Sequence, residues 1–150
     1  MLSLARVALV LLASATFSCG GDDSESTEPS QFAPWQEQSL EEREQYMRQV
    51  VEPRMRPIFQ GFDPDKHASF SCDTCHGDEG PSTDYAMPAV VEPLPLEDTL
   101  AYAEELNPEV NQFMLDQVFP VFVELMGEEK FSHDAPDGFR CTRCHQVLVE

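Results

Sequence analysis

The stretch "FSCDTCHGDEG" (residues 70–80) contains two cysteines three positions apart, and a histidine directly follows the second cysteine. The same arrangement returns in "FRCTRCHQ" (residues 139–146), again with a phenylalanine two positions before the first cysteine. The chain therefore carries two copies of C-x-x-C-H, made of Cys72, Cys75 and His76, and of Cys141, Cys144 and His145. The chemistry of this repeated motif decides what fold and function we expect.

Four kinds of site use closely spaced cysteines. Zinc could bind the four motif cysteines as thiolates, but this leaves both histidines unused. A redox dithiol needs a βαβ frame that the sequence lacks, and a disulfide between cysteines three positions apart would be strained. C-x-x-C-H is also the attachment motif of c-type haem, in which the cysteines form thioethers and the histidine binds the iron. Only this interpretation uses every motif residue, so we expect two haem c groups.

Helical patterns surround the two motifs. Apolar residues recur at helical spacing in residues 39–61, where Ser39 and Glu42 form a capping-box pattern and Gly61 is a plausible end. A short helix is expected over residues 95–106. A third follows over residues 107–127, with Asn107 as its cap and Gly127 as its end. No stretch alternates with period two, so the sequence predicts an all-α fold with few or no strands.

An internal repeat links the helices to the motifs. The stretch "YMRQVVEP" (residues 46–53) matches "FMLDQVFP" (residues 113–120), and each copy leads through an apolar run and a loop to F-x-C-x-x-C-H. We therefore expect two helix–loop–CxxCH units, over about residues 39–80 and 107–150. Pro53 and Pro120 occupy the same repeat position, and because proline lacks an N–H group we expect each to bend its helix.

Residues from about Glu41 to the C-terminus resemble the small dihaem c-type cytochrome lipoproteins of Gram-negative bacteria. The unit of methionine-bearing helix, loop and C-x-x-C-H also resembles that of the cytochrome subunit of photosynthetic reaction centres. The resemblance implies an all-α fold organised around its haems, and electron transfer as the function. The chain has two such units rather than the four of the reaction-centre subunit, so that subunit's specific role is not implied.

The sixth ligand of each iron is predicted from the repeat. Met47 and Met114 are the methionines that align between the two units, so we expect them to be the distal ligands. His67 and His133 do not align, and we expect them at the surface or near haem propionates. Three other methionines are alternative ligands. Met55 and Met126 are alternatives because their spacing from the cysteines fits the reaction-centre unit better, and Met87 is one because it precedes a proline.

The N-terminus has the features of an export signal. Residues 1–18 contain Arg6 followed by an apolar run too short to span a bilayer, as in a signal peptide. Cys19 follows directly and resembles the lipid-bearing cysteine of bacterial lipoproteins, although Thr16 stands where that family prefers leucine. Residues 19–34 are polar and acidic, which predicts a lipid-anchored linker ahead of a haem domain over residues 35–150.

Charge narrows the possible partners. The 150 residues carry a net charge of −19, and 41% of them are hydrophobic. The negative charge argues against nucleic acid or an anionic membrane face as a partner, and it favours a basic partner protein. We expect an electron carrier at the periplasmic face of a membrane, docking on a basic cytochrome or oxidoreductase. The alternatives are an enzyme of the dihaem peroxidase type and a structural zinc protein.

Overall fold

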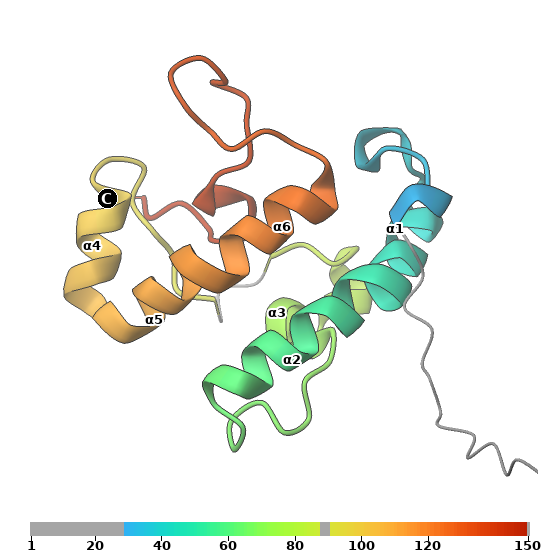
Figure 1. Cartoon of the computed structure of the whole chain (residues 1–150), viewed down its shortest axis with the longest axis horizontal. Helices are drawn as coiled ribbons and strands as arrows, with labels where there is room; N and C mark the ends of the chain where they lie inside the picture. The colour runs from blue at the N-terminus through green and yellow to red at the C-terminus, as the bar shows by residue number, and fades with distance from the viewer. Residues whose placement is uncertain (1–28, 88–90, 150) are drawn as a thin grey trace, which may run out of the picture.

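The computed structural model describes residues 29–87 and 91–149, whose regular structure is helical (Figure 1). These residues contain no strand, and their sheet-like pairings are two isolated bridges, Leu94 with Val147 and Lys130 with Phe139. The all-α prediction is therefore confirmed. No helix within the two described ranges combines the length and the apolar character needed to cross a membrane.

The first long helix consists of α1 (Leu40–Tyr46), a π-helical turn (Met47–Val51) and α2 (Glu52–Phe62). The predicted capping box is present, because the Ser39 side chain accepts the Glu42 N–H while the Glu42 carboxylate accepts the Ser39 N–H. The predicted end at Gly61 is wrong by one residue. The chain leaves the helix at Asp63 in an extended conformation, so no left-handed glycine is needed there.

The second long helix consists of α5 (Pro108–Phe113), a π-helical turn (Met114–Val118) and α6 (Phe119–Met126). The Asn107 side chain accepts the Val110 N–H, and Gly127 ends the helix with φ +62°, both as predicted. The short helix before it, α4 (Thr99–Leu106), begins later than the predicted residue 95. Asp98 has φ +53°, which breaks the helical path in front of Thr99.

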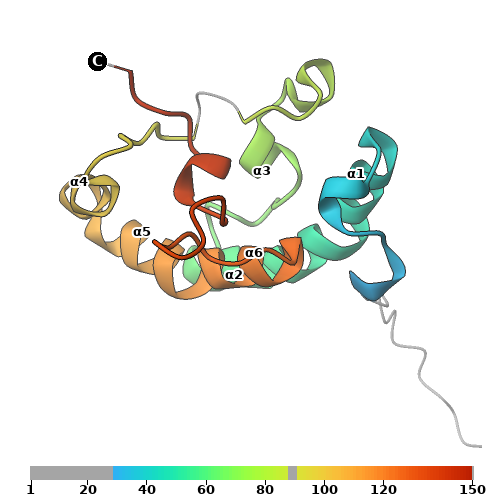
Figure 2. The same ribbon diagram turned by 90° about the horizontal axis from the view of Figure 1, so that it is seen from above.

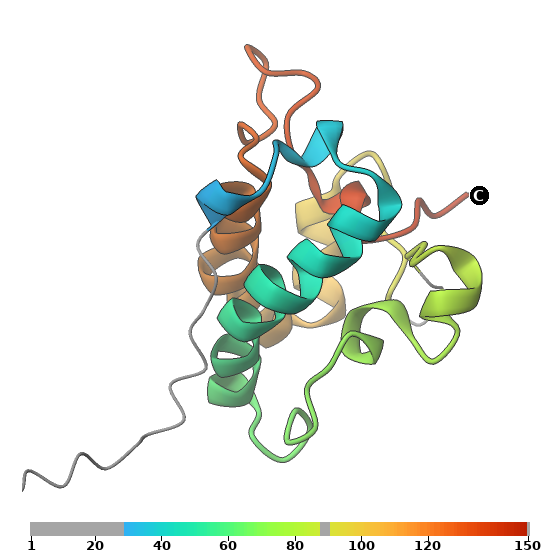
Figure 3. The ribbon, with the colours of Figure 1, turned by 90° about the vertical axis from the view of Figure 1, so that its right-hand side faces the viewer.

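The two π-helical turns begin at the aligned methionines and end just before the aligned prolines. Glu52 N–H donates to the Met47 carbonyl, and Phe119 N–H donates to the Met114 carbonyl, each five residues back. A proline ring clashes with the carbonyl four residues before it, and a wider turn relieves that clash. Figure 3 shows α1 and α2 as one helix that changes direction at this turn, so the bend takes the form of a π-turn.

The two long helices pack reciprocally. The π-turn of each helix contacts the α-helical half of the other, so that α2 meets Met114–Val118 and α6 meets Met47–Val51. The Phe62 and Phe113 rings stack with their centroids 4.1 Å apart. The core that this packing buries consists of Tyr46, Val50, Val51, Met55, Phe70, Phe113, Val118, Leu125, Met126 and Phe139.

Both C-x-x-C-H motifs lie on the same side of the helix pair. In Figure 2, α3 (Asp73–His76) and the C-terminal segment both stand above the layer of α2, α5 and α6. The phenylalanine two residues before each motif anchors it, since Phe70 is 4% and Phe139 is 6% exposed. The fold thus holds both motifs against one shared core.

Candidate functional site

Each C-x-x-C-H motif forms a single helical turn. The His76 N–H donates to the Cys72 carbonyl and the His145 N–H donates to the Cys141 carbonyl, at 2.9 Å in both motifs. Residues at positions i, i+3 and i+4 of such a turn share one face. The two thiols and the imidazole of each motif are therefore presented together.

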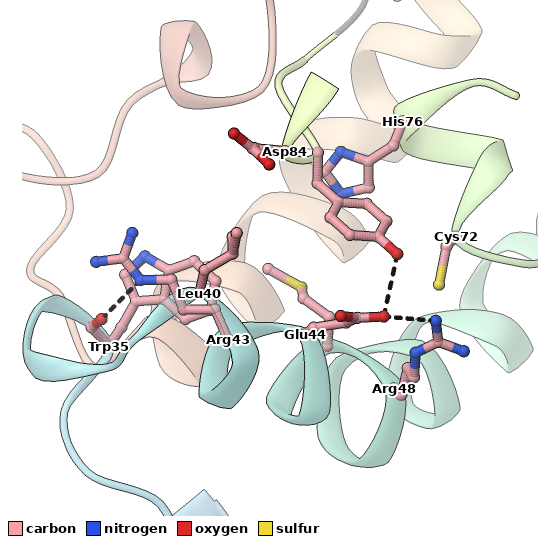
Figure 4. Close-up of a pocket in the computed structure, with 10 residues that line it drawn as sticks. Trp35, Leu40, Arg43, Glu44, Arg48, Cys72, His76 and Asp84 are labelled. Carbon is pink, nitrogen blue, oxygen red and sulfur yellow. Dashed lines mark hydrogen bonds and ion pairs between the residues drawn. The ribbon is translucent and has the colours of Figure 1, made fainter. Parts of the chain in front are cut away.

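A pocket of about 210 Å³ opens beside the first motif. Cys72 and His76 line it from the motif, and Met47 lines it from the π-helical turn. Figure 4 shows Cys72 and His76 facing the helix that carries Glu44 and Arg48. The structure thus brings the predicted site residue Met47 together with Cys72 and His76, which lie 25 and more positions further along the sequence. The remaining lining residues are Trp35, Leu40, Arg43, Glu44, Arg48, Asp84 and Tyr85.

A polar network closes one side of this pocket. The Glu44 carboxylate accepts a hydrogen bond from Arg48 at 2.6 Å and one from the Tyr85 hydroxyl at 3.2 Å. The Arg48 bond, and secondarily the Tyr85 bond, hold the pKa of Glu44 below its ordinary value. The Tyr85 ring in turn meets the His76 ring edge-on, with centroids 5.5 Å apart. Tyr85 therefore connects α1 to the histidine of the first motif.

The imidazole of His76 is partly enclosed. Burial lowers its pKa, and the nearby main chain of Tyr85 offsets part of that effect. Nδ1 of His76 is buried and has no hydrogen-bond partner among the described residues. A neutral imidazole is the form that binds a metal ion, so these surroundings favour the state of the ring that a metal requires.

The second motif holds its histidine differently. Nδ1 of His145 lies 2.7 Å from the Glu92 carbonyl oxygen, a contact in which Nδ1–H donates. This tautomer leaves the Nε2 lone pair free to bind a metal. The surrounding chain is paired, because Leu94 N–H donates to the Gln146 carbonyl at 2.9 Å and Leu148 N–H donates to the Leu94 carbonyl at 3.0 Å. The connection between the two units thus fixes the second motif.

The methionines fall into two groups. Met47 and Met114 are half-buried and open the two π-helical turns, and Met47 lines the pocket of the first motif. Met55 and Met126 are 1% and 5% exposed and belong to the core. Met87 is half-buried, does not line the pocket, and accepts a hydrogen bond from Gln146 through its carbonyl. Of the candidate ligands, only Met47 shares the pocket with a motif histidine.

The two remaining histidines stand apart from the pocket. His67 packs edge-on against Phe59, with ring centroids 5.1 Å apart, and burial lowers its pKa. His133 is exposed. Neither lines the pocket beside the first motif. Cys19, the predicted lipidation site, lies outside the described residues.

The second cysteines of the two motifs, Cys75 and Cys144, both pack against the core. Burial raises the pKa of Cys75 to about 12 and that of Cys144 to about 11, and the charge of Cys144 adds to the effect at Cys75. A redox dithiol requires a lowered thiol pKa, so these surroundings do not favour one. Within residues 29–87 and 91–149, no three His, Cys, Asp or Glu side chains gather as a metal-binding group.

Several pocket residues escaped the sequence analysis. Leu40, Arg43, Glu44, Met47 and Arg48 follow the spacing i, i+3, i+4, i+7 and i+8, which is one face of a helix. Counting backwards from Met47 at this spacing would have found Leu40, Arg43 and Glu44, and Arg48 is the next residue after Met47. Tyr85 has no comparable signal, because it comes from an irregular loop and is positioned with φ +57°.

Comparison of the chain with protein-family models, with curated proteins and with solved structures found no match.

Proposed function

We propose that this protein transfers electrons and carries two covalently attached haem c groups, one at each C-x-x-C-H motif. The observation that carries the proposal is the pocket in which Cys72, His76 and Met47 meet. Cys72 would form a thioether bond to a haem c group here, and the His76 imidazole and the Met47 sulfur would ligate its iron. Met47 lies 25 positions before Cys72 and 29 before His76, so its meeting with them does not follow from the motif alone.

The second site is supported by the repeat and by its histidine. Met114 opens a π-helical turn at the position of Met47, and His145 has its Nε2 lone pair free because Nδ1 donates to a carbonyl. Cys141 and Cys144 would form the thioethers of this site, as Cys72 and Cys75 would in the first. Bound haem c supplies a one-electron ferric–ferrous couple.

The chain's own residues would control the surroundings of that couple. In the first site, the pairing of Glu44 with Arg48 and Tyr85 keeps a carboxylate charge fixed and compensated beside the pocket. Leu40, Met47 and Trp35 supply apolar contact to the same pocket. A site whose charges are balanced in this way needs little rearrangement between two oxidation states. That property suits an electron carrier.

The two alternatives receive less support. A structural zinc site needs four ligands within bonding distance, and the described residues show no such gathering of the four cysteines. A peroxidase-type enzyme needs a catalytic group beside an open iron site, and no observation favours one here. For location, we propose export and anchoring through Cys19 at the periplasmic face of a bacterial membrane, with a basic cytochrome or oxidoreductase as partner and no binding of nucleic acid.

Intact-mass measurement tests the proposal directly. The protein is expressed in a bacterium that attaches haem in its periplasm, and loosely held haem is removed with acid–acetone. We expect the wild-type mass to exceed that of the processed polypeptide by two haem groups. The double variants Cys72→Ala/Cys75→Ala and Cys141→Ala/Cys144→Ala should each retain one haem, and they serve as controls for each other. A wild-type mass equal to that of the bare polypeptide contradicts the proposal.

A further inference from the structure

Helix α4 belongs to neither repeated unit and is poorly covered. None of its residues is buried, and its principal contacts are with α5. In Figure 1 it stands at the edge of the molecule, away from the crossing of the two long helices. Leu96 and Leu100 are 64% and 54% exposed, although leucine side chains usually lie inside a protein. An apolar patch of this kind that is rimmed by polar residues often marks an interaction site.

The segment of the chain that contains this helix carries most of the chain's net negative charge. Residues 77–129 contain no lysine, arginine or histidine. The acidic residues of this segment number thirteen: Asp78, Glu79, Asp84, Glu92, Glu97, Asp98, Glu104, Glu105, Glu109, Asp116, Glu124, Glu128 and Glu129. Since the net charge of the whole chain is −19, this segment supplies most of it. The charged residues of this segment are therefore all of one sign.

The carboxylates nearest to the exposed leucines have no basic partner. Among the described residues, Glu124 and Glu128 of this segment form ion pairs, with Arg54 and Arg143. Around α4, Glu97, Asp98, Glu104, Glu105 and Glu109 are exposed and form no ion pair there. We call the surface formed by Leu96, Leu100 and these five carboxylates the α4 surface.

The α4 surface connects directly to the second motif. The chain that leads into α4 passes Glu92, whose carbonyl accepts the His145 Nδ1–H, and Leu94, which pairs with Val147. A partner bound at α4 would therefore sit beside the unit that carries His145 rather than beside the pocket of the first motif. This places the second site nearer to the docked partner.

We propose that the α4 surface is the docking site of a basic redox protein, an inference that rests on the proposed electron-transfer function. Its exposed leucines supply apolar contact and its carboxylates supply charge, which are the two components that transient interfaces combine. A second copy of this chain would bring like charges together, and an anionic membrane would be repelled. A basic partner instead gains steering from the unpaired carboxylates, which raises the rate of association.

The test uses the full-length holoprotein and mitochondrial cytochrome c, a small basic haem protein, as the probe. Binding is measured by surface plasmon resonance at low and at high salt, and electron transfer by stopped-flow absorbance. The variant Glu97→Gln/Glu104→Gln/Glu105→Gln removes three charges from the α4 surface. The control variant Glu37→Gln/Glu41→Gln/Asp65→Asn removes three exposed charges in or next to the first unit. These three side chains make no hydrogen bond or ion pair in the described structure.

We expect the α4 variant to lower the association rate at low salt about tenfold, with the control changing it less than threefold, because local steering accounts for at least that factor. The variant Leu96→Ser/Leu100→Ser should instead raise the dissociation rate. Equal losses in the α4 and control variants, or no binding of wild type at low salt, would overturn the docking site. In that case the intact mass of the wild type would still include two haem groups. Failure of the proposed function would instead appear as a wild-type mass that lacks them.

Discussion

Substitutions at two methionines that lie two turns apart on one helix distinguish a role in iron ligation from a role in core packing. Met47 is half-buried and lines the pocket with Cys72 and His76, whereas Met55 is 1% exposed and lies in the core. Leucine has nearly the volume of methionine but no sulfur, and such exchanges in a core cost less than about 1.5 kcal/mol. Met47→Leu therefore removes a possible iron ligand without opening a cavity.

The two exchanges should give opposite results. We expect Met47→Leu to abolish the share of the ferric far-red charge-transfer band that comes from the first haem and to lower one of two reduction potentials. Met55→Leu should leave the band and both potentials in place. Met55→Ala, by contrast, should cost about 2–5 kcal/mol in the free energy of unfolding, because it truncates a fully buried side chain. In the second unit, Met114 is the candidate ligand and Met126 is the buried core methionine, and the same exchanges apply to them.

The assays are absorption spectroscopy of the oxidised protein and urea denaturation followed by circular dichroism. The double variant Met47→Leu/Met114→Leu should have no far-red band at all. If Met55→Leu loses the band while Met47→Leu keeps it, the pocket beside Cys72 is not the distal side of the first haem. If Met87→Leu removes the first site's share of the far-red band while Met47→Leu does not, the two sites have differently placed ligands. The repeat then fails to predict the ligand of the first site.

Three further outcomes are expected. Tyr46→Phe removes a buried 2.5 Å hydrogen bond to the Leu125 carbonyl, and it should cost about 1–3 kcal/mol in urea denaturation; an unchanged midpoint would contradict this. The proposed second haem should have the lower reduction potential, because donation from His145 Nδ1 to the Glu92 carbonyl raises the basicity of the ring, while Nδ1 of His76 has no hydrogen-bond partner among the described residues. Redox titration of the two single-haem cysteine variants measures this, and the reverse order would refute it. Cys19→Ser should move the protein from the membrane fraction to the soluble periplasmic fraction, as an acyl anchor is lost; wild type that is already soluble would rule out the anchor.

Local features of this protein were readable from the sequence because their causes are local. The Ser39 capping box, the Asn107 cap and the Gly127 end all arise from backbone hydrogen bonds or dihedral preferences within a few residues. The helical class follows from the same short-range periodicity. The aligned methionines and prolines also located the two places where the helices widen into π-turns, although the sequence indicated a bend rather than that form.

Tertiary structure alone decided which of these residues meet. Tyr85 reaches Glu44 across 41 positions and Glu92 reaches His145 across 53, and no periodic pattern encodes contacts of that separation. Met47 and Met55 look alike in sequence, yet one lines a pocket and the other is sealed in the core. That difference arises because the crossing of the two long helices sets which face of each helix is covered. A helix fixes the angular position of each side chain, but only its neighbours determine whether that side chain meets core or pocket.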